Sequence, residues 1–185
     1  PNKGRRHNFY RSELENFLLL CNENNLDPSS IKGSYAGALG KPQFISSSYR
    51  NYAIDFDNDN YADLWNSNAD VIGSVANYLK RNGWSRNGLI LTDLDVENNK
   101  STLEKLSKKS YKPHTVYKKY INFKTVSPKE INMSEKLSVI KRIEGNKNVY
   151  SFGHNNFYII TRYNRSRLYA LAVHTLAQEI KIQSQ

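Results

Sequence analysis

The order of periodic segments in this 185-residue sequence predicts an α+β fold. Apolar residues at helical spacing dominate the first half, short runs rich in β-branched and aromatic residues follow, and a helical pattern closes the chain. Helices and strands do not alternate, so a parallel sheet built from βαβ units is not expected. The length suffices for one buried core with a small appended subdomain.

The first part of the chain, residues 1–84, is predicted to be mainly helical. Leu14, Phe17, Leu18 and Cys21 recur at three- and four-residue spacing and indicate one face of a helix from about His7 to Asn24. Two more helices are expected at 46–52 and 70–80, the second ended by Gly83.

The second part has weaker periodicity. Residues 85–136 are predicted to form an inserted, partly extended subdomain, and residues 137–185 to add short strands and a helix. Strands are expected at 115–117, 120–123, 137–140, 148–152 and 156–160. The closing helix, from about Arg165 to Lys181, is expected to bury Leu168, Leu171, Ala172, Leu176 and Ile180.

The charge balance indicates an anionic partner. There are 27 basic and 17 acidic residues, a net charge of +10, which favours nucleic acid, an acidic membrane surface or an anionic cell-wall polymer. No arginine-rich helix, zinc-finger spacing or aromatic RNA-binding motif is present, so nucleic acid is not expected as a specific partner. Much of the lysine lies between Lys100 and Lys147, where a solvated surface is the simpler interpretation. Cys21 is the only cysteine, which excludes a disulfide framework.

An acidic run in the first part has the spacing of a calcium loop. Asp55, Asp57 and Asp59 occupy positions 1, 3 and 5 of an EF-hand-type loop, and Tyr61 at position 7 can offer its backbone carbonyl. Three carboxylates at alternate positions would repel one another without a cation. The alternative is an acidic surface turn, and the spacing favours calcium.

The match to the EF-hand pattern is incomplete at two positions. Position 6 is Asn60 instead of glycine, although asparagine tolerates the left-handed conformation. Position 12 is Asn66, which cannot replace the bidentate glutamate. The next carboxylate is Asp70, so we expect a longer loop that closes on this residue.

A glycine-rich loop, Gly33–Phe44, precedes the acidic run. It carries Ser34, Tyr35 and Gln43, which are hydrogen-bonding and stacking groups and not core formers. Such a loop is typical of a ligand-facing wall, but glycine content alone favours a tight connector between helices.

Catalytic motifs are not evident. The sequence contains no zinc-protease, phosphate-loop, nucleophile-elbow or dinucleotide fingerprint. Glu13 and Glu15 are candidate acids, but their place on a helix beside charged neighbours indicates solvated surface, where the pKa is not raised as a general acid requires. No role is assigned to the scattered histidines His7, His114, His154 and His174.

Several separated motifs resemble the lytic murein transglycosylase B family. The resemblance covers about Tyr10 to Trp84 and Leu137 to the C-terminus, and it fades between Ser85 and Lys136. The motifs that carry it occur in the family's order at 33–38, 43–44, 47–49, 75–78, 83–84 and 157–164.

The resemblance implies a lysozyme-like, mainly helical core with a small β-rich insertion and an EF-hand-like calcium loop that has a late aspartate. It implies cleavage of peptidoglycan between N-acetylmuramic acid and N-acetylglucosamine without water, which leaves a 1,6-anhydro end. One glutamate would act first as acid and then as base, unlike the carboxylate pair of most glycosidases.

The resemblance also implies substrate-binding residues. Ser34 and Gln43 match family positions that line the saccharide cleft. The positions around the cleaved bond and its neighbouring subsites are matched by Tyr78, Tyr163, Asn164 and Tyr169. Without the family, Tyr78 would be interpreted as a core aromatic residue of an apolar helix.

One departure from the family is important. The family's catalytic glutamate lies in a Glu-Thr-x-x-Gly segment before the region aligned with Phe9, and this sequence has none. We therefore expect the acid upstream of Pro1, in an N-terminal segment of the same protein, and expect this chain alone to be inactive. Peptidoglycan glycan strands are the expected partner. The expected location is the periplasm or cell envelope, with an outer-membrane anchor in the missing N-terminus.

Three alternative functions remain open from the sequence. The first is a non-catalytic peptidoglycan-binding module that keeps the cleft without its acid. The second is a muramidase-type hydrolase, and the third and weakest is a basic nucleic-acid-binding domain.

Overall fold

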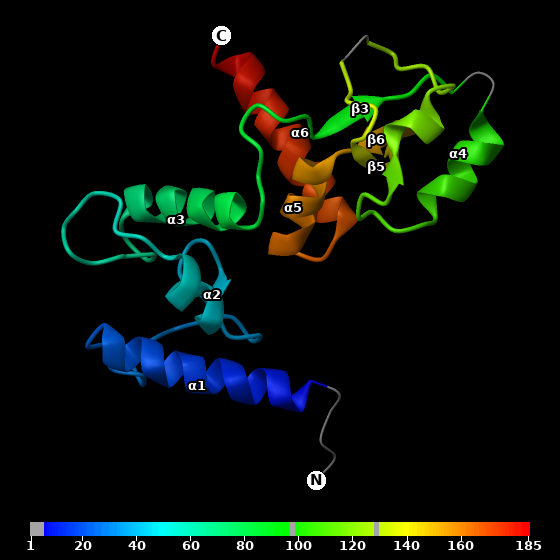
Figure 1. Cartoon of the computed structure of the whole chain (residues 1–185). Coiled ribbons are helices and arrows are strands. Elements are labelled where there is room, and N and C mark those ends of the chain that lie inside the picture. The colour runs from blue at the N-terminus through cyan, green and yellow to red at the C-terminus, as the bar shows by residue number, and fades with distance from the viewer. Residues whose placement is uncertain (1–5, 97–98, 128–129) are drawn as a thin grey trace. The chain divides into compact units, whose positions relative to one another are not determined.

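Six α-helices and two antiparallel sheets form the part of the chain that the computed structural model describes, residues 6–96, 99–127 and 130–185 (Figure 1). The chain divides into two compact units, Pro1–Arg81 and Asn82–Gln185. Each unit is described by itself below. The expected three-part division into 1–84, 85–136 and 137–185 stays a prediction.

The first unit contains three helices and a two-stranded hairpin. These are α1 (His7–Glu23), β1 (Ala38–Leu39), β2 (Phe44–Ile45), α2 (Ser46–Tyr52) and α3 (Asn68–Arg81). All three predicted helices are confirmed, with ends shifted by at most two residues. Gly83 has φ +97°, a left-handed conformation suited to glycine just after a helix.

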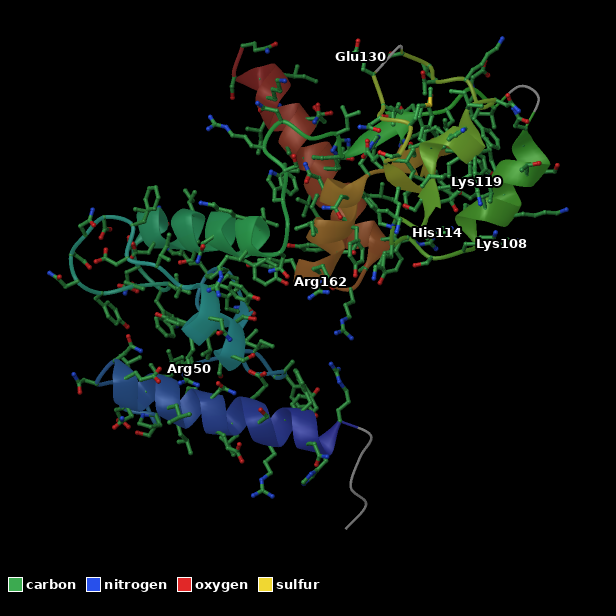
Figure 2. All side chains as sticks on the ribbon, in the orientation of Figure 1. Arg50, Lys108, His114, Lys119, Glu130 and Arg162 are labelled. Atoms are coloured by element: carbon green, nitrogen blue, oxygen red, sulfur yellow. The ribbon has the colours of Figure 1, made fainter. Side chains whose placement is uncertain are left out.

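Helix α1 packs against α2 through a few residues. Leu20 and Cys21 are buried, and Arg50 of α2 reaches α1 with its Nη2 atom 2.6 Å from a carboxylate oxygen of Glu23 (Figure 2). By contrast, Leu14 and Leu18 are 58% and 52% exposed. Of the predicted apolar face, Cys21 is therefore buried and Phe17 half-buried, whereas the other two residues are exposed.

The second unit is built on a four-stranded antiparallel sheet with strand order β3-β6-β5-β4. Its strands are β3 (Leu91–Asp93), β4 (Thr115–Val116), β5 (Lys136–Glu144) and β6 (Lys147–Gly153). Its helices are α4 (Lys100–Ser107), the 3-10 helix η1 (Tyr117–Tyr120), α5 (Asn155–Tyr163) and α6 (Arg167–Gln183). β5 and β6 form a hairpin in which Val139 lies opposite Phe152, and Gly145 at φ +56° lies in its turn.

Alternating residues of β5 enter two different hydrophobic clusters. Leu137 and Val139 pack with Phe152 and with Leu103 of α4. Ile140 packs with Phe157 of α5 in a second cluster, which also includes Ala170 of α6. The period of two along a strand explains how one strand supplies both clusters.

Two strand predictions are wrong. Residues 120–123 end the 3-10 helix and enter a turn, with the amide of Phe123 bonded to the carbonyl oxygen of Tyr120. Residues 156–160 belong to α5 and not to a strand. The aromatic and β-branched composition of this run suggests a strand, but Phe157 and Ile160 are spaced to pack together against Ile140.

The closing helix is confirmed, but its predicted burial is wrong at four of five positions. Leu168, Leu176 and Ile180 are 78%, 62% and 55% exposed, and Ala172 is also exposed, whereas Leu171 is half-buried. Burial is confined to the part of α6 that packs on α5, where Ala170 is fully buried. Within the described residues, no helix combines the length and apolar content needed to cross a membrane.

A pH-dependent contact joins α4 to the sheet. The carboxylate of Glu104 accepts a hydrogen bond from Lys141 Nζ at 2.8 Å and another from the hydroxyl of Tyr150. These bonds lower the pKa of Glu104 from 4.5 to about 2, and burial with the neighbouring carboxylate raises the pKa of Tyr150 to about 12.

The Glu104 contact should stabilise the fold only while the carboxylate is ionised. Because the folded-state pKa is lowered, its contribution is complete above about pH 4.5 and lost as the pH falls through about 2. We expect Glu104→Gln to melt at a lower temperature than the wild type at pH 6. The melting temperatures of the two proteins should converge as the pH is lowered from 6 to 2. A difference in melting temperature that stays constant over this range would contradict the assignment.

Candidate functional site

Four aspartates of the first unit converge on one point. Carboxylate oxygens of Asp55, Asp57, Asp59 and Asp70 all lie within 4.8 Å of one another. This is the set that the spacing predicts, including the late Asp70. Hard cations such as calcium prefer several carboxylate oxygens at one centre, so the residues fit this ion.

The backbone of the acidic loop is wrapped around its first aspartate. Oδ1 of Asp55 accepts from the amide of Asn58 at 2.6 Å, and Oδ2 accepts from the amide of Asn60 at 2.8 Å. The two asparagines have φ values of +62° and +73°, in the left-handed region that asparagine tolerates. Asn60 thus takes the conformation that glycine supplies in the standard motif. The amide of Tyr61 bonds Asp59 Oδ1 at 2.9 Å, while a role for the Tyr61 carbonyl stays a prediction.

Asp70 ties the two ends of the loop together. It lies in the first turn of α3 and is fully buried, and it accepts from the amides of Phe56 at 2.7 Å and Asp63 at 2.8 Å. A buried carboxylate with two backbone bonds positions the loop whether or not a cation is bound. Ser67 adds a hydroxyl bond to Asp57 at 2.7 Å, a support that loop spacing alone does not reveal.

The glycine-rich loop forms a tight hairpin that ends in β1 and β2. The Ser34 hydroxyl accepts from the amide of Ala38 at 3.1 Å, and the Ser34 carbonyl accepts from the amide of Gly37 at 2.8 Å. Tyr35 at the tip is completely exposed. An uncovered tyrosine ring provides a stacking surface for a ligand.

The hairpin is joined to the chain just after the acidic loop. The amide of Lys41 donates to the carbonyl of Leu64 at 2.8 Å, and Gly40 lies so close that a Cβ atom would be 2.6 Å from that oxygen. Gln43 adopts φ +55° and donates from its side-chain amide to Gly40 at 2.9 Å. Non-glycine residues in this conformation are uncommon and occur often at ligand sites.

Tyr78 lies beneath the hairpin as a buried aromatic residue of α3. Its ring is 5.8 Å from that of Phe44 in β2 and 4.7 Å from that of Tyr52 in α2. Packing of Tyr78 on Phe44 supports the hairpin at the position of Gln43, which directly precedes Phe44. Substrate contact by Tyr78 remains a prediction.

Glu13 has a structural role that the sequence interpretation as solvated surface misses. Its two carboxylate oxygens accept from the amide and hydroxyl of Ser47 at 2.9 and 2.7 Å, at the first turn of α2. It therefore caps a helix that begins 33 residues later in the chain. No local pattern could reveal this contact. Glu15, in contrast, is exposed and pairs only with Arg11 within the described residues.

We expect Glu13→Ala to lower the free energy of unfolding by about 1 kcal/mol, because an amide at the start of α2 loses its acceptor. The matched variant Glu15→Ala should change it by only about 0.3 kcal/mol, since an exposed ion pair contributes little. Urea unfolding of both variants measures the difference. Equal effects would contradict the capping role.

The second unit brings three predicted substrate residues together at the turn between α5 and α6. The rings of Tyr163 and Tyr169 are stacked at 6.3 Å with an interplanar angle of 5°. Asn164 follows α5, and its carbonyl accepts from the amide of Ser166, the residue that caps α6 through Tyr169. Burial raises the pKa of the Tyr169 hydroxyl, which therefore stays a neutral donor.

The fold is that of the lysozyme-like class of proteins. The chain belongs to the Transglycosylase SLT domain family, whose model matches residues 2–178. This agrees with the family resemblance of the sequence motifs.

Individual relatives support the assignment. Membrane-bound lytic murein transglycosylase B of Escherichia coli strain K12 is 35% identical over 98% of this chain and 48% of its own length. The catenated lytic transglycosylase SltB1 of Pseudomonas aeruginosa is 36% identical with a TM-score of 0.90, over 100% of this chain and 60% of that one. The E. coli lytic transglycosylase Slt35 in complex with calcium is 33% identical with a TM-score of 0.84, over 98% and 56%. The chain thus spans about half the length of its curated relative.

Proposed function

We propose that the protein carrying this chain is a peptidoglycan lytic transglycosylase of the cell envelope. It would cleave the β-1,4 bond between N-acetylmuramic acid and N-acetylglucosamine and leave a 1,6-anhydro end. The observation that carries the proposal is the family match over residues 2–178 together with the hairpin and tyrosine sites described above.

Two groups of residues are proposed to contact the glycan. In the first unit, Ser34 and Gln43 lie exposed on the glycine-rich hairpin, with Tyr35 uncovered at its tip. In the second unit, the stacked rings of Tyr163 and Tyr169 offer flat apolar surfaces, and Asn164, exposed directly after α5, supplies an amide. Aromatic faces suit sugar rings, and amides suit hydroxyl and N-acetyl groups.

The acid of the reaction is proposed to come from a part of the protein outside this sequence. Both carboxylate oxygens of Glu13 are used to cap α2, and Glu15 lies exposed beside Arg11. Neither residue is therefore proposed as the general acid. That glutamate would protonate the glycosidic oxygen and then, as base, accept the proton of the attacking C6 hydroxyl. The N-terminal segment and an outer-membrane anchor are part of this proposal.

Calcium is the proposed structural ion of the acidic loop. Asp55, Asp57, Asp59 and Asp70 would hold it, with the Tyr61 carbonyl as a further ligand. The ion would supply positive charge that offsets four neighbouring carboxylates. Because ligand binding to the folded state stabilises it, the melting temperature should rise with calcium concentration. Magnesium is the matched control, since it prefers a smaller octahedral site. An equal response to both ions would count against a calcium site.

Digestion of purified peptidoglycan tests the proposed activity. An anhydro end is lighter by one water than the reducing end that a muramidase-type hydrolase produces, so the masses of released fragments separate the two. A non-catalytic binding module would sediment with peptidoglycan and release nothing. This chain alone is expected to release nothing, so the digestion uses the protein that also carries the segment with the acid. Fragments with reducing ends, or none at all, from that protein would overturn the transglycosylase assignment.

A further inference from the structure

The net positive charge of the chain is carried by one of its two units. Nine of the 27 basic and nine of the 17 acidic residues fall in Pro1–Arg81, so this unit is neutral. The other 18 basic and eight acidic residues fall in Asn82–Gln185, which therefore carries the entire net charge of +10. A charge that served solubility alone would be expected to intersperse both signs over the whole surface.

Within the second unit, the charge gathers in one acid-free stretch. Residues 105–129 contain eight lysines and no aspartate or glutamate. We call the following exposed residues of this stretch, together with one lysine at the start of β5, the lysine face: Lys105, Lys108, Lys109, Lys112, Lys118, Lys119, Lys124 and Lys136.

The sheet brings parts of the lysine face together in space. Lys136 in β5 lies opposite Val116 in the edge strand β4, and the amide of Lys118 bonds the carbonyl of Met133 just before β5. α4, whose last turn contains Lys105, packs on β5 as well. Figure 2 shows the side chains of Lys108, His114 and Lys119 in the same part of the unit as α4.

Most lysines of the lysine face have no carboxylate partner in the described part of the chain. Among the described residues, Lys108 is the only lysine of this face whose Nζ atom lies within 4.0 Å of a carboxylate oxygen. That oxygen belongs to Glu104, at 3.7 Å, and the same carboxylate also pairs with Lys141. Like charges gathered on one surface attract a polymer that carries the opposite charge.

Two observations indicate a carboxylate-bearing glycan instead of a membrane. Among the described residues from Lys105 to Lys136, three large hydrophobic side chains are exposed, Ile121, Val126 and Met133. None of them lies in an α-helix, so this surface has no amphipathic helix face to enter a bilayer. Lys112 lies with its Nζ atom 5.9 Å from the centre of the Tyr158 ring, and Tyr111 lies beside the same ring at 6.5 Å. Aromatic rings next to an ammonium group suit a sugar polymer with acidic branches.

We propose that the lysine face binds the carboxylates of peptidoglycan stem peptides and holds the protein on the polymer. The proposal rests on the proposed function for the identity of the polymer. It assigns the second unit an anchoring surface that is separate from the residues proposed to contact the glycan at the cleaved bond.

Co-sedimentation with peptidoglycan sacculi at low salt tests the proposal. The double variant Lys118→Gln/Lys119→Gln should bind about 25-fold more weakly than the wild type, on the basis of about fivefold per lysine at an anionic surface. The matched control Lys32→Gln/Lys80→Gln removes the same charge from exposed positions of the first unit and should bind like the wild type. Equal weakening in both double variants would overturn the proposal.

Two further arms identify the binding partner. Sacculi whose carboxylates are blocked as amides should bind the wild type about as weakly as intact sacculi bind the Lys118→Gln/Lys119→Gln variant, and unchanged binding would contradict the proposal. Tighter binding to phosphatidylglycerol vesicles than to sacculi would replace it with a membrane surface. The digestion experiment and the binding experiment give independent results. Absent anhydro ends would contradict the proposed function without contradicting binding by the lysine face. Loss of specific binding would contradict the lysine face without contradicting the proposed function.

Discussion

Replacing Asp70 by alanine is expected to lower the free energy of unfolding by about 3 kcal/mol, even in the presence of chelator. The reason is that the buried carboxylate accepts from the amides of Phe56 and Asp63, and both amides would lose their acceptor. Asp70 thus has a structural role independent of any ion.

Asp57→Ala is the matched comparison, because it removes a carboxylate from the same cluster at an exposed position. In chelator it should change the stability little, since it also relieves repulsion among the aspartates. In calcium both variants should lose the stabilisation that the ion gives the wild type. Thermal unfolding of the three proteins with calcium and with chelator measures these differences. Equal losses for Asp57→Ala in both conditions would contradict its role as a ligand.

A second large effect is expected at Gly40 in the glycine-rich hairpin. Gly40→Ala should lower the free energy of unfolding by about 3 kcal/mol, because alanine is strained in the left-handed region and its Cβ would collide with the chain. The φ angle is +62°, and the added atom would lie 2.6 Å from the carbonyl oxygen of Leu64.

Gly37→Ala is the control for the conformational part of this effect. Its φ of +80° is also left-handed, but a Cβ there would meet no atom within 4 Å. We expect a loss of about 1 kcal/mol, from backbone strain alone. Urea unfolding separates the two values. Similar losses at both glycines would show that the close approach of Gly40 to Leu64 does not matter for stability.

The convergence of the four aspartates could be predicted from the sequence because its information is local. Aspartates at alternate positions place their carboxylates at one centre. Because position 12 is not a glutamate, the sequence predicts that Asp70 supplies the closing carboxylate. The helical segments were predictable for the same reason, since each depends on residues three and four positions apart.

The failures depend on contacts between distant residues. Residues 156–160 have the composition of a strand, and only packing of Phe157 and Ile160 against Ile140 shows why they are helical. Glu13 was interpreted as surface because its partner Ser47 lies 34 residues away. In α6, the apolar pattern predicted burial, yet Leu176 and Ile180 are exposed, because a pattern cannot specify what covers a helix.

The residues proposed to contact the glycan are an intermediate case. The family resemblance named Ser34, Gln43, Tyr163, Asn164 and Tyr169, and no residue pattern alone would have selected them. The structure groups the last three at the turn between α5 and α6, with the two rings stacked. Their contact with substrate stays a proposal that variants at these positions can test.

The measurement that tests the proposed chemistry most directly is digestion of peptidoglycan in water labelled with heavy oxygen, by the protein that carries both this chain and the proposed upstream acid. A transglycosylase uses the C6 hydroxyl of the sugar as nucleophile, so the new muramyl ends should contain no label. A hydrolase would place one labelled oxygen at each new end. Unlabelled anhydro ends are the predicted result, and labelled reducing ends would contradict the account.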